Sequence, residues 1–240
     1  MKKTIIAFLS IMGMAMAEPL TLPDYETNCS QTESHYYTWA DAIDKVNTWD
    51  YGYYVGATGG AIGTNWGTPT MKVNGIDMVE GDWTNDAVLL AGRGGAQGLV
   101  ATFVFGGDIE AGNTLSAITF NASGYSDNTV AGDITIALGV RTSEGKVIDG
   151  IDDVFTTFSS TSTTVSSITL GSSVDWKEGY RFIAVIKGIN TSSPTPTTPY
   201  AITNISASAE ITPTPAVPEP ATATLSLLAL AGLAARRRRK

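Results

Sequence analysis

Apolar side chains recur at every second position in several short segments, and this period constrains the fold more than any other feature. In residues 134–140, four large apolar side chains alternate with Thr135, Ala137 and Gly139. Residues 205–211 repeat the alternation with small polar and acidic residues between the apolar ones. A period of two places the apolar groups on one face of a β-strand. The pattern therefore predicts strands that bury one face and expose the other.

Other segments lack polar positions or are rich in strand-forming residues. Residues 99–105 and 182–186 are apolar on both faces, which is typical of central strands between two layers. Further strands, rich in Thr and in β-branched or aromatic residues, are predicted at residues 87–90, 115–120, 154–158 and 165–170. About nine or ten short strands at this spacing predict an all-β fold, an antiparallel β-sandwich that is jelly-roll-like.

Glycine and proline mark the connections between the predicted strands. Residues 106–108, 123–128 and 142–145 predict turns, the last of them a hairpin turn before residues 146–148. Residues 191–199 contain three prolines, which lack the amide donor that a regular element requires. These residues predict a long surface loop within the domain.

One segment of the body has the pattern of a helix. Thr38 is a candidate N-cap for residues 38–47, with Asp41 three residues later. Ile43 and Val46 would share one face of this helix. The sequence therefore predicts at most one short helix.

The N-terminus has the three-part pattern of a secretory signal. Two lysines within residues 1–3 precede an apolar core at residues 5–14, and Ala15 and Ala17 fit the small-residue rule for signal peptidase. The apolar core is too short to span a bilayer, which needs roughly 20 apolar residues. We expect export by the Sec machinery, cleavage by signal peptidase and a mature protein that begins at Glu18.

The C-terminal end combines three features in a fixed order. Pro218, Glu219 and Pro220 come first, and the apolar segment 221–235 follows. The chain then ends in the cations Arg236, Arg237, Arg238, Arg239 and Lys240. Such cations hold the cytoplasmic side of a short transmembrane segment by the positive-inside rule. The stretch resembles the PEP-CTERM sorting signal, which implies exosortase as the processing enzyme and Pro218, Glu219 and Pro220 as its recognition residues.

These ends divide the chain into four parts. We expect a signal peptide at 1–17, a β-sandwich domain at 18–211, a Thr/Pro linker at 212–217 and the sorting signal at 218–240. Polyproline-like stiffness in the linker would hold the domain away from the membrane. Cys29 is the only cysteine, so no intramolecular disulfide forms and stability must come from the core.

The charge balance excludes several classes of partner. The chain carries 15 Lys and Arg against 23 Asp and Glu, and seven of the cations lie in its two ends. The exported body is therefore strongly acidic, and it contains no Lys/Arg cluster that would attract phosphate groups. We therefore expect neither nucleic acid nor anionic lipid head groups as partners. Solubility and attraction of divalent cations are two open explanations for the acidity.

The chain offers few groups for catalysis or metal binding. His35 is the only histidine and Cys29 the only cysteine, which excludes zinc sites of the usual Cys/His types. The glycine-rich residues 92–98 lack the Lys and Ser/Thr of a phosphate-binding loop. We therefore expect no catalytic residues, no metal site and no enzymatic activity.

Carboxylates leave one enzymatic alternative open, because two acids across a sugar can hydrolyse a glycoside without a cofactor. The candidates are Asp108 with Glu110, and Asp149 with Asp152 and Asp153. A second group rich in side-chain oxygen consists of Asp82, Asn85 and Asp86. Loop oxygens of this kind can also bind calcium, although neither spacing is that of an EF-hand. Solvated loop acids are the simpler interpretation, so we expect no cofactor, with calcium as the alternative.

Aromatic residues gather early in the body. Residues 36–66 hold three of the five tryptophans and five of the nine tyrosines. Aromatic faces stack on sugar rings, and the candidate glycan contacts are Trp49, Tyr53 and Trp66. Large aromatic side chains also build sandwich cores, so core packing is the competing interpretation.

These patterns predict an exported, exosortase-sorted protein of the cell envelope or extracellular matrix. The resemblance implies transient anchoring in the inner membrane before delivery to the surface. The displayed sandwich is expected to be non-catalytic. Glycan binding through the aromatic cluster is a second interpretation of residues for which core packing is the favoured one. A carboxylate-dependent glycan-active enzyme is the alternative, and the sequence does not separate a glycan binder from a purely structural surface protein.

Overall fold

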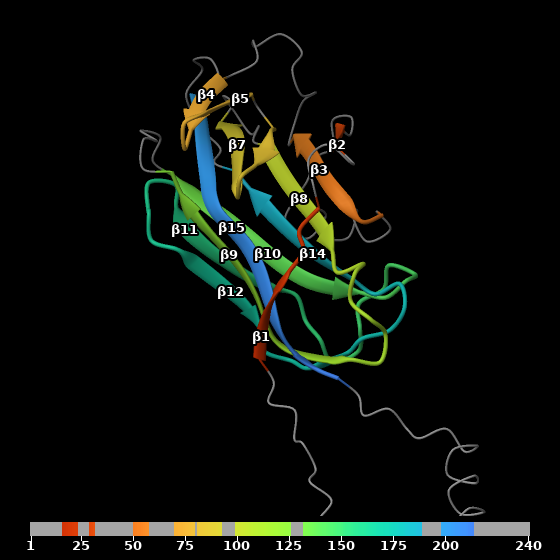
Figure 1. Cartoon of the computed structure of the whole chain (residues 1–240). Coiled ribbons are helices and arrows are strands. Elements are labelled where there is room, and N and C mark those ends of the chain that lie inside the picture. The colour runs from red at the N-terminus through yellow and green to blue at the C-terminus, as the bar shows by residue number, and fades with distance from the viewer. Residues whose placement is uncertain are drawn as a thin grey trace, which may run out of the picture.

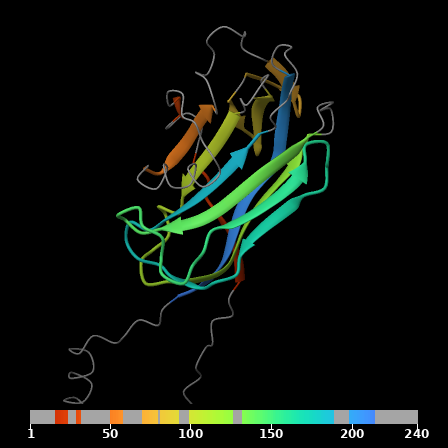
Figure 2. The same cartoon turned by 180° about the vertical axis from the view of Figure 1, so that it is seen from behind.

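Two β-sheets face each other and enclose a hydrophobic core (Figure 1). The computed structural model describes residues 16–23, 29–31, 50–57, 70–79, 81–92, 99–125, 132–188 and 198–213. We name the two layers sheet A, which lies in front in Figure 1, and sheet B, which the view from behind brings forward (Figure 2). The predicted all-β sandwich is confirmed.

Sheet A has seven strands in the order β12-β9-β15-β7-β6, with β1 paired to β15 and β13 paired to β9. Their bounds are β1 Met16–Leu20, β6 Trp83–Thr84, β7 Ala87–Gly92, β9 Thr114–Gly124, β12 Ser166–Leu170, β13 Val174–Asp175 and β15 Thr198–Thr212. The long strand β15 runs antiparallel to β1, β7 and β9. It therefore ties the upper and lower halves of the sheet together.

Sheet B has six strands in the order β11-β10-β14-β8-β3-β2. Their bounds are β2 Cys29–Gln31, β3 Gly52–Ala57, β8 Leu99–Phe105, β10 Asp133–Arg141, β11 Val154–Ser159 and β14 Arg181–Lys187. Strands β8 and β14 are interior strands, as their largely apolar sequences predict. The pair β2–β3 is parallel and is the departure from the predicted antiparallel arrangement.

The chain passes from one sheet to the other at most of its later connections. β8 in sheet B leads to β9 in sheet A, β9 leads back to β10, and β14 leads to β15. The β10–β11 hairpin stays within sheet B. Such crossings are typical of a jelly-roll-like sandwich. The described residues contain no helix, and the predicted helix at 38–47 lies outside them.

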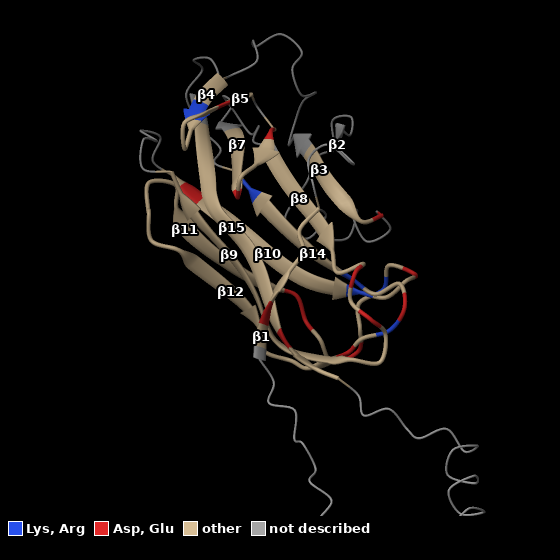
Figure 3. Ribbon diagram, viewed as in Figure 1, with Lys and Arg blue, Asp and Glu red and all other residues tan. Residues whose placement is uncertain are grey.

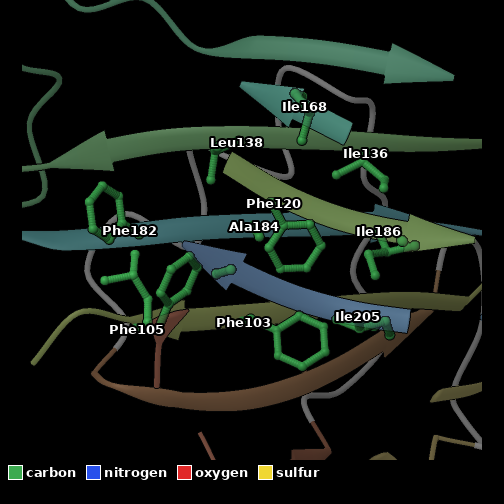
Figure 4. Close-up of a cluster of buried hydrophobic side chains, with 14 of the residues drawn as sticks. Phe103, Phe105, Phe120, Ile136, Leu138, Ile168, Phe182, Ala184, Ile186 and Ile205 are labelled. Carbon is green, nitrogen blue, oxygen red and sulfur yellow. The ribbon is translucent and has the colours of Figure 1, made fainter. Parts of the chain in front are cut away.

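The predicted period of two appears directly in the core. Along β10 the four alternating apolar side chains all point between the sheets, at 1% exposure or less. Aromatic rings fill the centre (Figure 4): the ring centroids of Phe105 and Phe182 lie 5.2 Å apart, and those of Phe103 and Phe120 lie 5.9 Å apart. Spacings of this size are favourable for tilted aromatic pairs. Both sheets therefore contribute rings to one continuous core.

Two predicted loop boundaries are wrong. β15 begins at Thr198, so Pro199 belongs to a strand, where it pairs with Ala91 of β7, rather than to the predicted loop 191–199. β9 runs to Gly124, so the predicted turn at 123–128 begins inside the strand. The predicted hairpin turn at 142–145 is present, since the Gly145 amide donates to the carbonyl of Thr142.

A two-stranded hairpin covers the upper end of sheet A (Figure 1). Strands β4 (Thr70–Val73) and β5 (Ile76–Val79) pair around a turn in which Asn74 has a φ of 49°. An Asn followed by Gly favours this tight two-residue turn. Met78 packs with Leu89 of β7 in a second hydrophobic cluster. The hairpin thus shields a part of the outer face of sheet A that is apolar.

The two ends of the folded body lie side by side (Figure 1). Met16 and Ala17 form the start of β1 and pair with Ile211 and Glu210 of β15. β15 ends at Thr212, one residue into the predicted linker. The predicted cleavage after Ala17 would therefore remove the first two residues of β1 and leave its remainder paired.

Candidate functional site

Tyr53 does not form the surface contact that was expected of it. Its side chain has 0% exposure, and its hydroxyl donates to the Gly81 carbonyl at 2.9 Å. Its ring centroid lies 5.0 Å from that of Phe103 in the core. Tyr53 is therefore a core residue, which corrects its prediction as a glycan contact. Trp49 and Trp66 lie outside the described residues.

A pocket of about 270 Å³ opens beside the ends of β1 and β8. Its lining consists of residues 21–23, Tyr51 and residues 104–108. The indole Nε1 of Trp83 donates to the Pro23 carbonyl at 2.8 Å and so fixes the first of these segments. Asp108 adds a carboxylate to a lining that is mainly apolar. Concave, largely apolar sites with a few polar groups are typical of ligand-binding pockets.

Tyr51 provides an aromatic surface at this pocket. Its side chain is 40% exposed, and its hydroxyl donates to the Tyr180 carbonyl at 2.9 Å. A Cβ at Gly107 would lie 2.9 Å from Cε2 of the ring, so the ring packs directly over the glycine backbone. The hydrogen bond and the glycine contact hold the ring in one orientation. A fixed and partly exposed ring is a suitable stacking surface for a sugar.

The glycines of the 106–108 turn are required by their surroundings. Gly106 has a φ of 94°, a left-handed conformation that favours glycine. A Cβ there would also lie 3.0 Å from Cδ2 of Phe182. The turn predicted from the sequence is thus part of the pocket wall. Its glycines allow the backbone to approach both the core and the Tyr51 ring.

Electrostatics keep the pocket tyrosine neutral. Partial burial raises the pKa of Tyr51 above its usual value, Arg181 opposes this shift and Asp108 adds to it. Burial likewise raises the pKa of Tyr54, whose hydroxyl donates to the Asp50 carbonyl at 2.9 Å. Both phenols are therefore protonated at neutral pH. The site offers hydroxyl groups, one carboxylate and an aromatic face, a set that suits a neutral polyhydroxyl ligand.

Among the described residues, charged side chains lie mostly in loops at one end of the sandwich (Figure 3). Asp153 is not available there as a catalytic acid, because it binds both Nη atoms of Arg141 at 2.6 Å. No group of three or more His, Cys, Asp or Glu side chains among the described residues is placed to hold a metal ion. Residues 149–153 were predicted as a catalytic or calcium-binding group of carboxylates. One of these carboxylates, Asp153, instead forms an ion pair.

The second oxygen-rich group shapes a turn. Asn85 and Asp86 have φ values of 47° and 57° and connect β6 to β7 as a tight hairpin. The Oδ2 atom of Asp82 accepts a hydrogen bond from the Val79 amide at 2.9 Å. Burial raises the pKa of Asp86. These contacts account for the residue types without a bound ion.

The C-terminal tail and the fold can be compared with those of known proteins. Residues 216–240 match the family described as the PEP-CTERM protein-sorting motif. This match confirms the predicted tail and marks the protein as one that is exported and sorted through a membrane. No helix among the described residues is both long and apolar enough to cross a membrane.

A similar solved structure is described as "Structural basis for the promiscuous specificity of the carbohydrate-binding modules from the beta-sandwich super family". The identity is 14%, the TM-score is 0.32, and the match covers 67% of this chain and 58% of that chain. A search of curated proteins gave no match.

Sequence reasoning missed most of the pocket lining. Leu22 and Phe105 are far apart in the chain, and no sequence pattern places them in one pocket. The available signal was the Gly106–Asp108 turn, in which Asp108 was named as a candidate acid, although the turn was not linked to an aromatic pocket. Tyr51 belonged to the predicted aromatic cluster and, among the described members of that cluster, is the one that lines the pocket.

Proposed function

We propose that this protein is an exosortase-processed component of the cell envelope or extracellular matrix that displays a non-catalytic β-sandwich. The sorting motif at residues 216–240 is the observation that carries this proposal. Sec export, removal of residues 1–17 by signal peptidase and transient anchoring in the inner membrane complete the route. The binding of Asp153 by Arg141 supports a structural role for that acid rather than a catalytic one.

The geometry of the two ends fits delivery through a membrane. Five residues, 213–217, lie between Thr212, the end of β15, and Pro218. The six steps from Thr212 to Pro218 would span about 19 Å in a polyproline-like linker, at roughly 3.1 Å per residue. The folded body would thus lie close to the membrane while the tail is processed. It would be free to leave once the tail is cut.

We further propose that the displayed sandwich binds a neutral glycan at the Tyr51 pocket. The exposed ring of Tyr51 over Gly107 supports this assignment. Trp49 is two residues before Tyr51, so its Cα lies within about 7 Å of that of Tyr51 and can extend the same surface. Trp66 remains a proposed contact on the strength of its residue type.

The sorting proposal is tested with Glu219→Ala in the full chain. Because Glu219 is the acidic residue of the Pro-Glu-Pro motif, the variant should remain unprocessed in the inner membrane. Glu178→Ala, in an exposed loop of the body, is the matched control and should be delivered normally. Cell fractionation and tail-specific immunoblotting measure the outcome. Normal delivery of the Glu219→Ala variant would count against the proposal.

The glycan proposal is tested separately by binding to an array of neutral polysaccharides. Tyr51→Ala should abolish binding without unfolding the body, since its side chain is partly exposed. Tyr125→Ala is the control, because Tyr125 lies away from the pocket and accepts a hydrogen bond from the Asn74 amide. Equal binding by the two variants, or no binding by the unmodified protein, would refute the glycan site while leaving the sorting proposal intact.

A further inference from the structure

The Tyr51 pocket is small for a ligand-binding site. Its volume of about 270 Å³ lies just below the range of roughly 300–1,000 Å³ that is usual for small-molecule sites. The pocket therefore accommodates one sugar-sized unit rather than several units of a polysaccharide side by side. Which unit it prefers depends on the chemical groups that its lining can satisfy.

Much of this lining is apolar. Leu22 and Pro23 are half-buried, and they line the pocket together with Phe105, which is 2% exposed. We call these three residues the apolar lining. Leu22 also packs against the main core, and the indole of Trp83 holds the Pro23 carbonyl at 2.8 Å. A ligand group that lies here loses its water and gains no hydrogen bond, so the apolar lining favours a methyl group over a hydroxyl.

Three hydrogen-bond donors in or next to the pocket are already engaged. The Tyr51 hydroxyl donates to the Tyr180 carbonyl and the Trp83 indole to the Pro23 carbonyl. The Ile109 amide donates to the Gly106 carbonyl at 3.3 Å. Among the side chains that line the pocket, the exposed Thr21 therefore offers the donor that is available to a ligand.

Asp108 supplies a hydrogen-bond acceptor. Its side chain is exposed, and no group among the described residues donates a hydrogen bond to its carboxylate. An ionised carboxylate accepts hydrogen bonds and does not donate them. A ligand that uses Asp108 must therefore present an N–H or O–H group to it.

An acetamido group fits this combination of surfaces. Its N–H can donate to Asp108, its carbonyl oxygen can accept from Thr21, and its methyl group can pack on the apolar lining. A hydroxyl in the same place could donate to Asp108, but it would leave the apolar lining without an apolar partner. An acetamido group thus satisfies polar and apolar parts of the pocket together.

The ligand class follows from these contacts and from the exposed ring of Tyr51. Resting on the function proposed above, we propose that the Tyr51 pocket binds an N-acetylated hexosamine unit of a neutral glycan. The sugar ring stacks on Tyr51, and its acetamido group lies between Asp108 and the apolar lining.

A matched pair of oligosaccharides tests this specificity. Chito-oligosaccharides and cello-oligosaccharides of equal length share one backbone, and an acetamido group in the first replaces one hydroxyl of each ring in the second. Calorimetric titration of the full chain in mild detergent should show about tenfold tighter binding of the chito-oligosaccharide. Equal or tighter binding of the cello-oligosaccharide, if Tyr51→Ala abolishes it, would overturn this inference and leave the proposed glycan site intact. No binding of any neutral glycan would refute the glycan site itself, and this inference with it.

Asp108 variants test the contact to the N–H group. Asp108→Ala should weaken chito-oligosaccharide binding roughly fivefold, through loss of one hydrogen bond. Glu110→Ala is the matched control, because Glu110 is a nearby exposed carboxylate that does not line the pocket. Asp108→Asn keeps an acceptor oxygen and should retain most of the affinity. Unchanged binding in Asp108→Ala, or an equal loss in Asp108→Ala and Asp108→Asn, would overturn the proposed contact.

The deacetylated oligosaccharide separates an acetamido site from a site for a basic sugar. This form carries ammonium groups in place of the acetamido groups, and it should bind more weakly than the acetylated form. Tighter binding that falls steeply as salt is raised, and that Asp108→Asn abolishes, would show an ion pair between Asp108 and a cationic sugar. That result would overturn the assignment of an N-acetylated unit.

Discussion

Replacing Asp153 with Ala should strongly destabilise the sandwich, because it leaves a buried guanidinium without its counter-charge. The side chain of Arg141 is 0% exposed, and that of Asp153 is 19% exposed. Both Nη atoms of Arg141 donate to the carboxylate at 2.6 Å, and Nη1 also donates to the Val140 carbonyl at 2.9 Å. The bidentate geometry is the strongest form of this ion pair.

The expected loss of stability in Asp153→Ala follows from the burial of Arg141 rather than from the attraction within the ion pair itself. Removing one partner of a buried pair costs about 3–5 kcal/mol, because the remaining charge stays desolvated. Arg181 lies directly opposite Arg141 on the next strand, so loss of Asp153 also leaves two like charges side by side. For a domain of this size, each kcal/mol lowers the thermal midpoint by about 2–4 °C, which gives a total of about 6–20 °C.

Thermal and urea unfolding of the full chain in mild detergent, followed by tryptophan fluorescence, measures this loss. Asp152→Ala is the control, since Asp152 is the exposed neighbour of Asp153. The free energy of unfolding of this variant should lie within about 0.5 kcal/mol of that of the unmodified protein. The double variant Arg141→Met with Asp153→Leu should recover most of the stability. If Asp153→Ala and Asp152→Ala unfold alike, the reasoning from burial is refuted.

Four further outcomes are expected. Gly107→Ala should displace the Tyr51 ring, because the new Cβ would lie 2.9 Å from it, and glycan binding should fall more than the thermal midpoint does. Tyr53→Phe should cost about 1 kcal/mol in urea unfolding through loss of the hydrogen bond to Gly81. Burial raises the pKa of Asp86, so the folded state binds that proton more tightly. The contribution of Asp86 to the free energy of unfolding should be largest at pH values below the ordinary Asp pKa, and it should decline as the pH rises through the raised pKa of Asp86. Asp86→Asn should remove this trend when the free energy of unfolding is measured against pH. A chelator should leave the thermal midpoint unchanged, and a clear drop would reveal a structural calcium ion.

The strands could be predicted where one local rule governs every residue. β10 follows a period of two without interruption, and its apolar side chains are buried as expected. β8 and β14 are largely apolar on both faces, and one of these faces meets the core. The apolar runs therefore predicted strands that are buried on both faces, and residues 100–105 and 182–186 are buried on both faces.

In sheet A, local backbone irregularities in β9 and β15 interrupt the period of two. Ala117 in β9 has a φ of 47°, and Asn204 in β15 has a φ of 56°. The register between these strands shifts between Thr203 and Ser206 and again between Ser208 and Glu210. A bulge of this kind inserts a residue and moves the apolar positions to the other parity. Alternation alone could not locate these points, because they depend on how two distant strands pair.

The candidate site could be predicted only in part, for a similar reason. Tyr53 and Tyr51 differ by two positions and have the same residue type, yet one is buried and the other lines the pocket. Tyr53 lies within β3, where its face meets the core, whereas Tyr51 precedes the strand. Which aromatic residue is exposed depends on the position at which β3 begins. The aromatic cluster therefore mixes core and surface roles that composition does not separate.

The order of export and folding follows from the position of β1. β1 pairs with β15, the last of the described strands in the chain. If export proceeds from the N-terminus, as in the proposed Sec route, residues around Ala17 would lack this strand partner until β15 emerges and would be accessible to signal peptidase. Once β15 is present, Ala17 pairs with Glu210 and its backbone lies within a sheet. The proposed cleavage would therefore occur before the sandwich closes, and closure would then bring the new N-terminus at Glu18 beside the segment that leads to the sorting signal.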